Sequence, residues 1–277
     1  MKKRTLISPG LLLTVVLGAA IPPAPAARVE AAKTPKLETI LDRAGDRVEL
    51  FWRQFSSVSC TETVEQVKLS EKDKPLNRRQ AEYDYVIFMQ LTGKELRVEE
   101  SRRLTSETRP KKKKRPSQRS LLLTSGFPIM MLIFHPQFQD RYLFQLAAGP
   151  DDGPRPGLTR IDFEQVAGAE SLSVLRLKDR DYPLAWAGTA WVEAGSGAIV
   201  RIRTKLREPL TEVGLRSLTS DVWYSDISFT EATESYRLPE RAEVDARSRG
   251  QHWHNIHTFT AYKRFSVNTE VTIGGTQ

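Results

Sequence analysis

The first patterned stretch of the chain is 37–55, where apolar residues recur at three- and four-residue steps with charged residues between them. This spacing gathers the apolar side chains on one broad face of an α-helix. The other face carries Glu, Asp and Arg, so we expect the helix to lie on a sheet with its charged side in water. The apolar positions are Leu37, Ile40, Leu41, Ala44, Val48, Phe51, Trp52 and Phe55.

After this helix the apolar period shortens to two residues, which is the period of a β-strand. Strands joined by short connections, with few helices, predict a mainly β fold built on a large antiparallel sheet that curls into a barrel or sandwich. The predicted strands are 58–69, 82–91, 95–104, 141–146, 158–163, 172–178, 219–229, 239–246 and 252–267.

The clearest hairpin is 186–206. Its second half alternates apolar residues such as Val200 and Ile202 with the basic residues Arg201, Arg203 and Lys205. A half-buried strand requires this alternation, and we expect its basic side to face water. Residues 194–197 supply the turn, since glycine adopts positive φ there without strain.

Residues 126–134 are apolar on every side and stop before Pro136. Pro128 fits the first turn of a helix and Ser125 is a suitable cap, so we expect a short helix that must be covered on all sides. In a curled sheet it would plug the concave face. It is either an ordinary core helix or a lid over a hydrophobic cavity, for which the adjacent methionines Met130 and Met131 are an adaptable surface.

Bulky aromatic residues also fall on the predicted strands. They either fill the core or line a cavity that a curled sheet leaves open, and such cavities commonly bind apolar ligands. The candidate cavity residues are Phe88, Phe127, Met130, Met131, Phe134, Trp186 and Trp223.

The amino terminus has a basic start at 1–4, an apolar run at 6–21 and a small-residue cleavage site at 24–26. This order is typical of a secretory signal peptide, here 1–26, although an uncleaved anchor is the alternative. The apolar run is shorter than the roughly 20 residues of a membrane-spanning helix. We therefore expect a periplasmic or secreted protein with a polar leader at 27–36, a single β-rich domain at 37–270 and a tail at 271–277.

The formal net charge of +8 is concentrated in the signal segment and in a basic loop at 107–118, and the rest of the chain is close to neutral. The loop is either a solvated connection or a contact for an anionic lipid surface or an acidic envelope protein. Nucleic acid is not an expected partner, because an exported protein rarely meets it. The candidate contact residues are Lys111, Lys112, Lys113, Lys114 and Arg115.

No catalytic pattern stands out. His252 and His254 share one face of a predicted strand and are weak metal candidates, whereas His257 points the opposite way. Ser196 lies in a hairpin turn and not on a nucleophile elbow. Cys60 is the one cysteine, so we expect a small buried residue and no internal disulfide. We expect no cofactor and no enzymatic activity.

Residues 188–202 run as an apolar strand ending at Glu193, a small turn with Gly195, then apolar residues and Arg201. This resembles the strand–turn–strand signature of bacterial outer-membrane lipoprotein-sorting proteins. Segments 236–239 and 262–265 are similar to parts of uncharacterised envelope relatives, and the resemblance extends over 186–267. It implies an open half-barrel whose concave face covers acyl chains. We expect the first helix to pack on this sheet and the apolar helix to serve as plug or lid.

The leading hypothesis is a monomeric, non-enzymatic envelope protein that binds a lipid or acylated ligand in the concave sheet, with a role in lipoprotein or lipid trafficking. One alternative is a structural or interaction protein of the envelope that docks through its basic loop. The least favoured is a metal-dependent hydrolase that uses the histidine strand.

Overall fold

The computed structural model describes residues 36–54, 57–92, 95–108, 126–148, 153–177, 180–229 and 235–264, which belong to one compact unit, Pro35–Gln277. Its first element is the helix α1 (Leu37–Gln54), which confirms the helix expected at 37–55. The apolar stripe is buried, with Ile40 and Ala44 0% exposed and Val48 3% exposed. The apolar face therefore drives packing onto the rest of the unit, as the periodicity requires.

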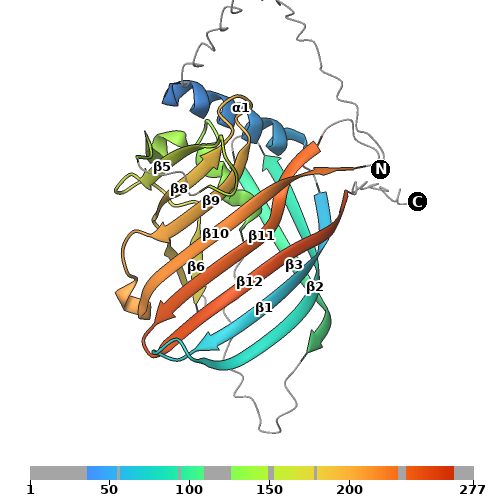
Figure 1. Cartoon of the computed structure of the whole chain (residues 1–277), viewed down its shortest axis with the longest axis vertical. Helices are drawn as coiled ribbons and strands as arrows, with labels where there is room; N and C mark the ends of the chain where they lie inside the picture. Colours follow the sequence, from blue (N-terminus) through green and yellow to red (C-terminus); the bar gives the residue numbers. More distant parts are fainter. Residues whose placement is uncertain are drawn as a thin grey trace, which may run out of the picture. The chain divides into compact units, whose positions relative to one another are not determined.

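Ten strands form one antiparallel sheet in the order β3-β2-β1-β12-β11-β10-β9-β8-β5-β4 (Figure 1). The sheet is not closed, because β3 and β4 stand at its two edges. It is curled and carries helices, which confirms the predicted fold class. The strands are β1 (Ser57–Leu69), β2 (Pro75–Thr92), β3 (Glu95–Thr108), β4 (Tyr142–Leu146), β5 (Thr159–Gln165), β8 (Trp186–Val192), β9 (Ile199–Leu206), β10 (Leu215–Ser228), β11 (Ser235–Ser248) and β12 (Gln251–Arg264).

One face of the sheet, here called the inner face, carries the core. Ile202, Val222 and Ala242 are cross-strand partners on β9, β10 and β11, and each is at most 1% exposed. Their neighbours along each strand point to the outer face, because side chains alternate along a strand. Burial of such rows stabilises the sheet by about 25 cal/mol for each Å² of apolar surface removed from water.

The apolar segment forms the 3₁₀-helix η1 (Pro128–Phe134), almost all of it buried. The predicted helix is therefore present, although it is the tighter 3₁₀ type, and Ser125 lies outside the described residues. The Tyr224 hydroxyl donates to the Phe127 carbonyl at 2.8 Å, and the Phe127 ring lies 4.8 Å from the ring of His257. At the other end, Phe134 contacts Phe163 of β5, 6.1 Å between ring centroids. The segment thus crosses the inner face from β12 to β5.

The helix α1 covers η1 at one end of the sheet (Figure 1). The Gln139 amide donates to the carbonyls of Leu41 and Phe134, at 3.2 and 2.7 Å. The turn between β8 and β9 also packs on α1. A Cβ atom on Gly197, where φ is +73°, would come within 2.4 Å of the α1 backbone. Glycine is required at this turn by both its φ and the close contact.

Some elements differ from expectation. β2 begins at Pro75 and not at 82, because its first six residues are polar or exposed and carry no alternating apolar signal. A separate two-stranded sheet pairs β6 (Val174–Leu177) with β7 (Arg180–Pro183), and β7 was not predicted because four residues are too few to show a period. Two further 3₁₀ turns are η2 (Gln139–Arg141) and η3 (Thr211–Val213).

Several predictions fall on segments that are not described. The signal peptide, almost all of the polar leader and the carboxy-terminal tail lie outside the described residues, as does the basic loop beyond Thr108, with Lys111, Lys112, Lys113, Lys114 and Arg115. Within the described ranges, no helix combines the length and the apolar composition that crossing a membrane requires.

Candidate functional site

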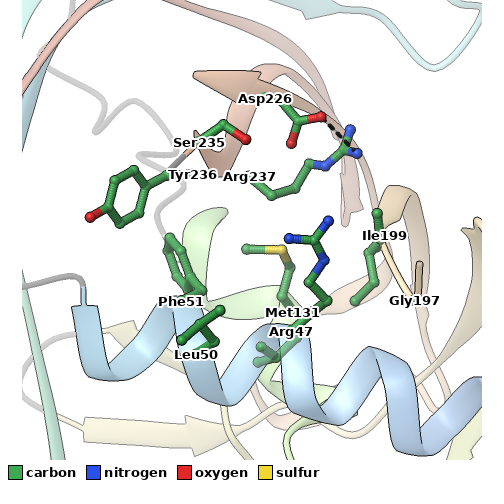
Figure 2. A pocket seen from close by; sticks show the side chains of 12 residues that line it. Arg47, Leu50, Phe51, Met131, Gly197, Ile199, Asp226, Ser235, Tyr236 and Arg237 are labelled. Atoms are coloured by element: carbon green, nitrogen blue, oxygen red, sulfur yellow. Dashed lines mark ion pairs between the residues drawn. The ribbon is translucent and has the colours of Figure 1, made fainter. Parts of the chain in front are cut away.

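A pocket of about 330 Å³ opens at the end of the sheet that α1 covers. Figure 2 shows that its walls come from α1, η1, the β8–β9 turn and the neighbouring ends of β10 and β11. These segments are far apart in sequence and meet only because the sheet curls beneath the helix. The volume lies at the lower end of the range of about 300–1,000 Å³ that is usual for small-ligand sites.

One wall of the pocket is apolar. Leu50 and Phe51 project from α1, Met131 from η1, Ile199 from β9 and Tyr236 from β11. Leu50 is 43% exposed and is one of the larger apolar side chains that the described surface leaves in water. This wall can remove an apolar chain from water, at about 0.8 kcal/mol for each buried CH₂ group.

The opposite end of the pocket is charged. Arg237 lies 3.2 Å from Asp226 and donates to the Tyr224 carbonyl at 3.4 Å, and its Nη2 atom is 3.9 Å from Glu193. Arg47 points from α1 toward the same end (Figure 2), and it forms no ion pair with any residue that the structure describes. The pocket is therefore amphipathic, with cations at one end and hydrocarbon along one side.

The electrostatics of Arg237 are unfavourable in the free protein. Burial lowers the pKa of Arg237, and the neighbouring cations of Arg155 and Arg47 act in the same direction. The carboxylates of Asp226 and Glu240 oppose this shift without cancelling it. The Arg237 Nε atom is buried and has no hydrogen-bond acceptor among the described residues. A buried donor without an acceptor raises the free energy of a site by about 1–3 kcal/mol.

The predicted cavity residues are divided between the two faces of the sheet. Met131 lines the pocket. Four others lie in the core around η1: Phe127, Met130, Phe134 and Trp186.

Phe88 and Trp223 occupy the outer face. Phe88 is 37% exposed and alternates with the buried Ile87 on β2. Trp223 alternates with the buried Tyr224 on β10 and lies 4.7 Å from the Arg201 guanidinium. Since successive residues of a strand point to opposite faces, neither side chain lies on the inner face of the sheet, which η1 covers.

Arg201 differs most from the expectation that basic residues of β9 face water. It is only 8% exposed, because its guanidinium lies between the rings of Trp191 and Trp223, at 4.6 and 4.7 Å from their centres. Its Nε atom donates to Asp221 at 2.6 Å. We call Trp191, Arg201, Trp223 and Asp221 the outer ladder. Planar guanidinium groups stack on aromatic rings and pair with carboxylates in this way.

A second charged group is buried on the inner face, and we call it the Glu62 cluster: Glu62, Tyr85, Glu100, Arg102 and His257. Glu62 and His257 are 0% and 1% exposed. Arg102 reaches from β3 over the Tyr85 ring, at 4.3 Å, to form an ion pair with Glu62. The Nδ1 atom of His257 lies 2.8 Å from the same carboxylate. The Glu62 charge is therefore shared between two donors.

Burial and pairing set the protonation of the Glu62 cluster. Burial opposes the ionisation of Glu62, but hydrogen bonds from His257 and Arg102 hold its pKa below the usual range. Burial lowers the pKa of His257, so the neutral ring donates to Glu62. Burial raises the pKa of Glu100, which accepts a hydrogen bond from the Gly126 amide at 2.8 Å. The cluster thereby holds the start of η1 in place.

The two histidines proposed as metal candidates, His252 and His254, belong neither to the pocket nor to the Glu62 cluster. His252 contacts Asp73 at 2.8 Å and Asp245 at 2.6 Å, and His254 is 3.7 Å from Asp245. They share the outer face, while His257 lies on the inner one. In the described part of the chain, no group of three or more His, Cys, Asp or Glu residues is arranged to hold a metal ion.

Neither candidate nucleophile shows activation. Cys60 is buried, as expected, and desolvation together with the nearby Glu62 raises the pKa of its thiol to about 12. A thiol with so high a pKa is a poor nucleophile at neutral pH. Ser196 donates from Oγ to Glu193 at 2.7 Å, which holds the hairpin turn.

Sequence reasoning missed most of the pocket. Arg47 is exposed, as expected for the charged side of the helix, but it also borders the pocket, because it precedes Leu50 and Phe51 by three and four residues. Arg237 was noticed only within the segment 236–239. Asp226 carried no signal, because a single acid on a strand usually faces water.

Comparisons with known proteins show a distant likeness to solved structures. No family model matches the chain, and no curated protein matches it. Among solved structures, the chain is similar to an outer membrane lipoprotein-sorting protein domain from Vibrio parahaemolyticus. The two are 12% identical with a TM-score of 0.35, over 83% of this chain and 93% of that chain.

Proposed function

We propose that this protein is a non-enzymatic binding protein of the cell envelope, exported through its amino-terminal segment, which takes an acyl chain of a lipid or acylated ligand into the pocket beneath α1. The pocket itself carries the proposal, because its apolar wall is open to solvent at Leu50 while the surrounding core is closed. The resemblance of 188–202 to lipoprotein-sorting proteins supports the same ligand class.

The mechanism is burial followed by release at the mouth of the pocket. Each CH₂ group that enters gains about 0.8 kcal/mol, so ligands with longer chains should bind more tightly. Met131 and Phe51 come from two elements that pack on each other, so small movements of α1 over η1 would change the space for a chain.

The test is to purify the mature protein from the periplasm without detergent and to analyse an organic extract by mass spectrometry. We expect lipid or acylated ligand at about one molecule per chain. The variant Leu50→Asp should lose it, because a carboxylate at the mouth opposes entry of hydrocarbon. Leu143→Asp is the matched control, since Leu143 is 67% exposed and lies on β4, outside the pocket.

Circular dichroism should show all three proteins folded. An empty extract from the folded wild type, together with no uptake of added dodecanoate, would exclude lipid binding and favour an envelope interaction protein. Equal ligand content in Leu50→Asp and Leu143→Asp would place the ligand elsewhere on the molecule.

A further inference from the structure

Two arginines that lie far apart in the sequence converge at one end of the pocket. Arg47 comes from α1 and Arg237 from β11, and Figure 2 shows both side chains at the charged end. Burial is the main cause of the lowered pKa of Arg237, and the nearby cations of Arg155 and Arg47 add to it. Arg47 is exposed and has no carboxylate partner among the described residues, so an anion between the two groups would gain a charge-assisted partner on each side.

The free hydrogen-bonding capacity points the same way. The terminal nitrogens of Arg237 contact the Tyr224 carbonyl and Asp226, and its Nε atom is buried. The donors that are open to a ligand therefore come mainly from the exposed guanidinium group of Arg47. Guanidinium groups pair well with carboxylates and phosphates, because their planar N–H donors match the spacing of the oxygens.

The position of the arginines beside the apolar wall defines the ligand further. Arg47, Leu50 and Phe51 are neighbours on one side of α1, at spacings of three and four residues. Tyr236 and Arg237 of β11 both border the pocket. A ligand held by the arginines would therefore have its hydrocarbon part against Leu50 and Phe51.

We infer that Arg47 and Arg237 form a subsite for the anionic head of a single-chain amphiphile, a carboxylate or a phosphate monoester, whose chain lies along the apolar wall. The inference rests on the proposed function and adds to it a ligand class. It predicts selectivity for charge at equal chain length, which the apolar wall alone would not provide.

The experiment compares four probes by isothermal titration calorimetry on delipidated protein: dodecanoate, dodecyl phosphate, the neutral 1-monolauroylglycerol and inorganic phosphate. Wild type should bind the two anionic amphiphiles about tenfold more tightly than the neutral one. The double variant Arg47→Gln/Arg237→Gln should bind all three amphiphiles within about twofold of each other, with affinity for the neutral one unchanged. The matched control is Arg78→Gln/Arg103→Gln, which removes two exposed arginines of β2 and β3.

The outcomes separate the two proposals. If the wild type binds the neutral amphiphile as tightly as the anionic ones, the proposed anion subsite is wrong and lipid binding stands. The same holds if the double variant keeps the preference for anionic amphiphiles. If no amphiphile binds, the proposed function fails. Inorganic phosphate binding as tightly as dodecyl phosphate would overturn the amphiphile assignment in favour of a small-anion site. Should the double variant unfold, the single variant Arg47→Gln, on the exposed side of α1, gives the same test.

Discussion

The outer ladder and the pocket both place arginine beside aromatic or apolar side chains. They differ in how far other residues of the chain compensate the arginine charge. In the outer ladder, the Arg201 guanidinium lies within 4.7 Å of the ring centres of two tryptophans, and its Nε atom donates to Asp221. In the pocket, Arg47 lacks a described ion-pair partner and Arg237 keeps a buried Nε without an acceptor.

The difference separates a structural arginine from one that is available to a ligand. Burying a charge is costly unless pairing and hydrogen bonds compensate, and the ladder provides that compensation within the chain. The pocket leaves part of the compensation to something that enters it. Residue type alone would not have distinguished the two regions, because both place arginine beside aromatic or apolar side chains.

The largest expected effect comes from removing Arg201 from the outer ladder. Arg201→Ala should lower the free energy of unfolding by about 2–4 kcal/mol, because it leaves Asp221 partly buried without its main partner. Urea denaturation followed by tryptophan fluorescence measures this, and ligand binding at the pocket should be unchanged. Arg203→Ala is the control, since Arg203 also contacts Asp221 but its side chain is 46% exposed, and it should cost less than about 1 kcal/mol. Equal losses in the two variants would contradict a structural role specific to Arg201.

An intermediate effect concerns the Glu62 cluster, which should behave like the ladder because its charges are internally paired. The lowered pKa of His257 means that the folded protein binds fewer protons than the unfolded chain, in which the histidine has an ordinary pKa near 6.5. The unfolding free energy should therefore fall as pH drops from about 7.5 through 6.5, by at most about 1.4 kcal/mol per pH unit.

This pH dependence is measured by urea denaturation at closely spaced pH values. His257→Asn, which keeps a donor toward Glu62, should flatten the slope relative to wild type, whereas His254→Asn on the outer face should not. The raised pKa of Glu100 contributes stability at low pH that is lost as pH rises, which is the opposite sign. It is common to all variants, so the difference between them isolates His257. A slope unchanged by His257→Asn would contradict the prediction.

The smallest expected effect is in the pocket and sharpens the contrast with Arg201. Arg47→Gln should change the unfolding free energy by no more than about 0.5 kcal/mol, and toward higher stability, because it relieves repulsion of Arg237. Thermal melts in the absence of ligand measure this, with Arg78→Gln on β2 as the control. A loss of stability as large as that of Arg201→Ala would show that Arg47 is structural and would remove the contrast between the two regions.

Much of the fold could be predicted because periodicity is a local property. The apolar stripe from Leu37 to Trp52 leaves one arrangement in which a helix buries all its members, and the glycine turn at 194–197 joins two strands in one way. The predicted hairpin and the C-terminal strands are present, with ends that differ by a few residues. β7 and the first part of β2 were missed because short or fully polar strands leave no period to detect.

The sequence by itself therefore determined a mainly antiparallel β fold with one amphipathic helix and one apolar helical segment. Only the tertiary structure decided which charges are satisfied. The pocket joins residues 47–51 and 197–199 with Asp226 and 235–237. The burial of Arg201 depends on Trp191 and Trp223 from the strands on either side. The pairing and solvation of a charge depend on distances across the fold. The local alternation that defines a strand is the same whether or not the neighbouring strand carries a partner for that charge.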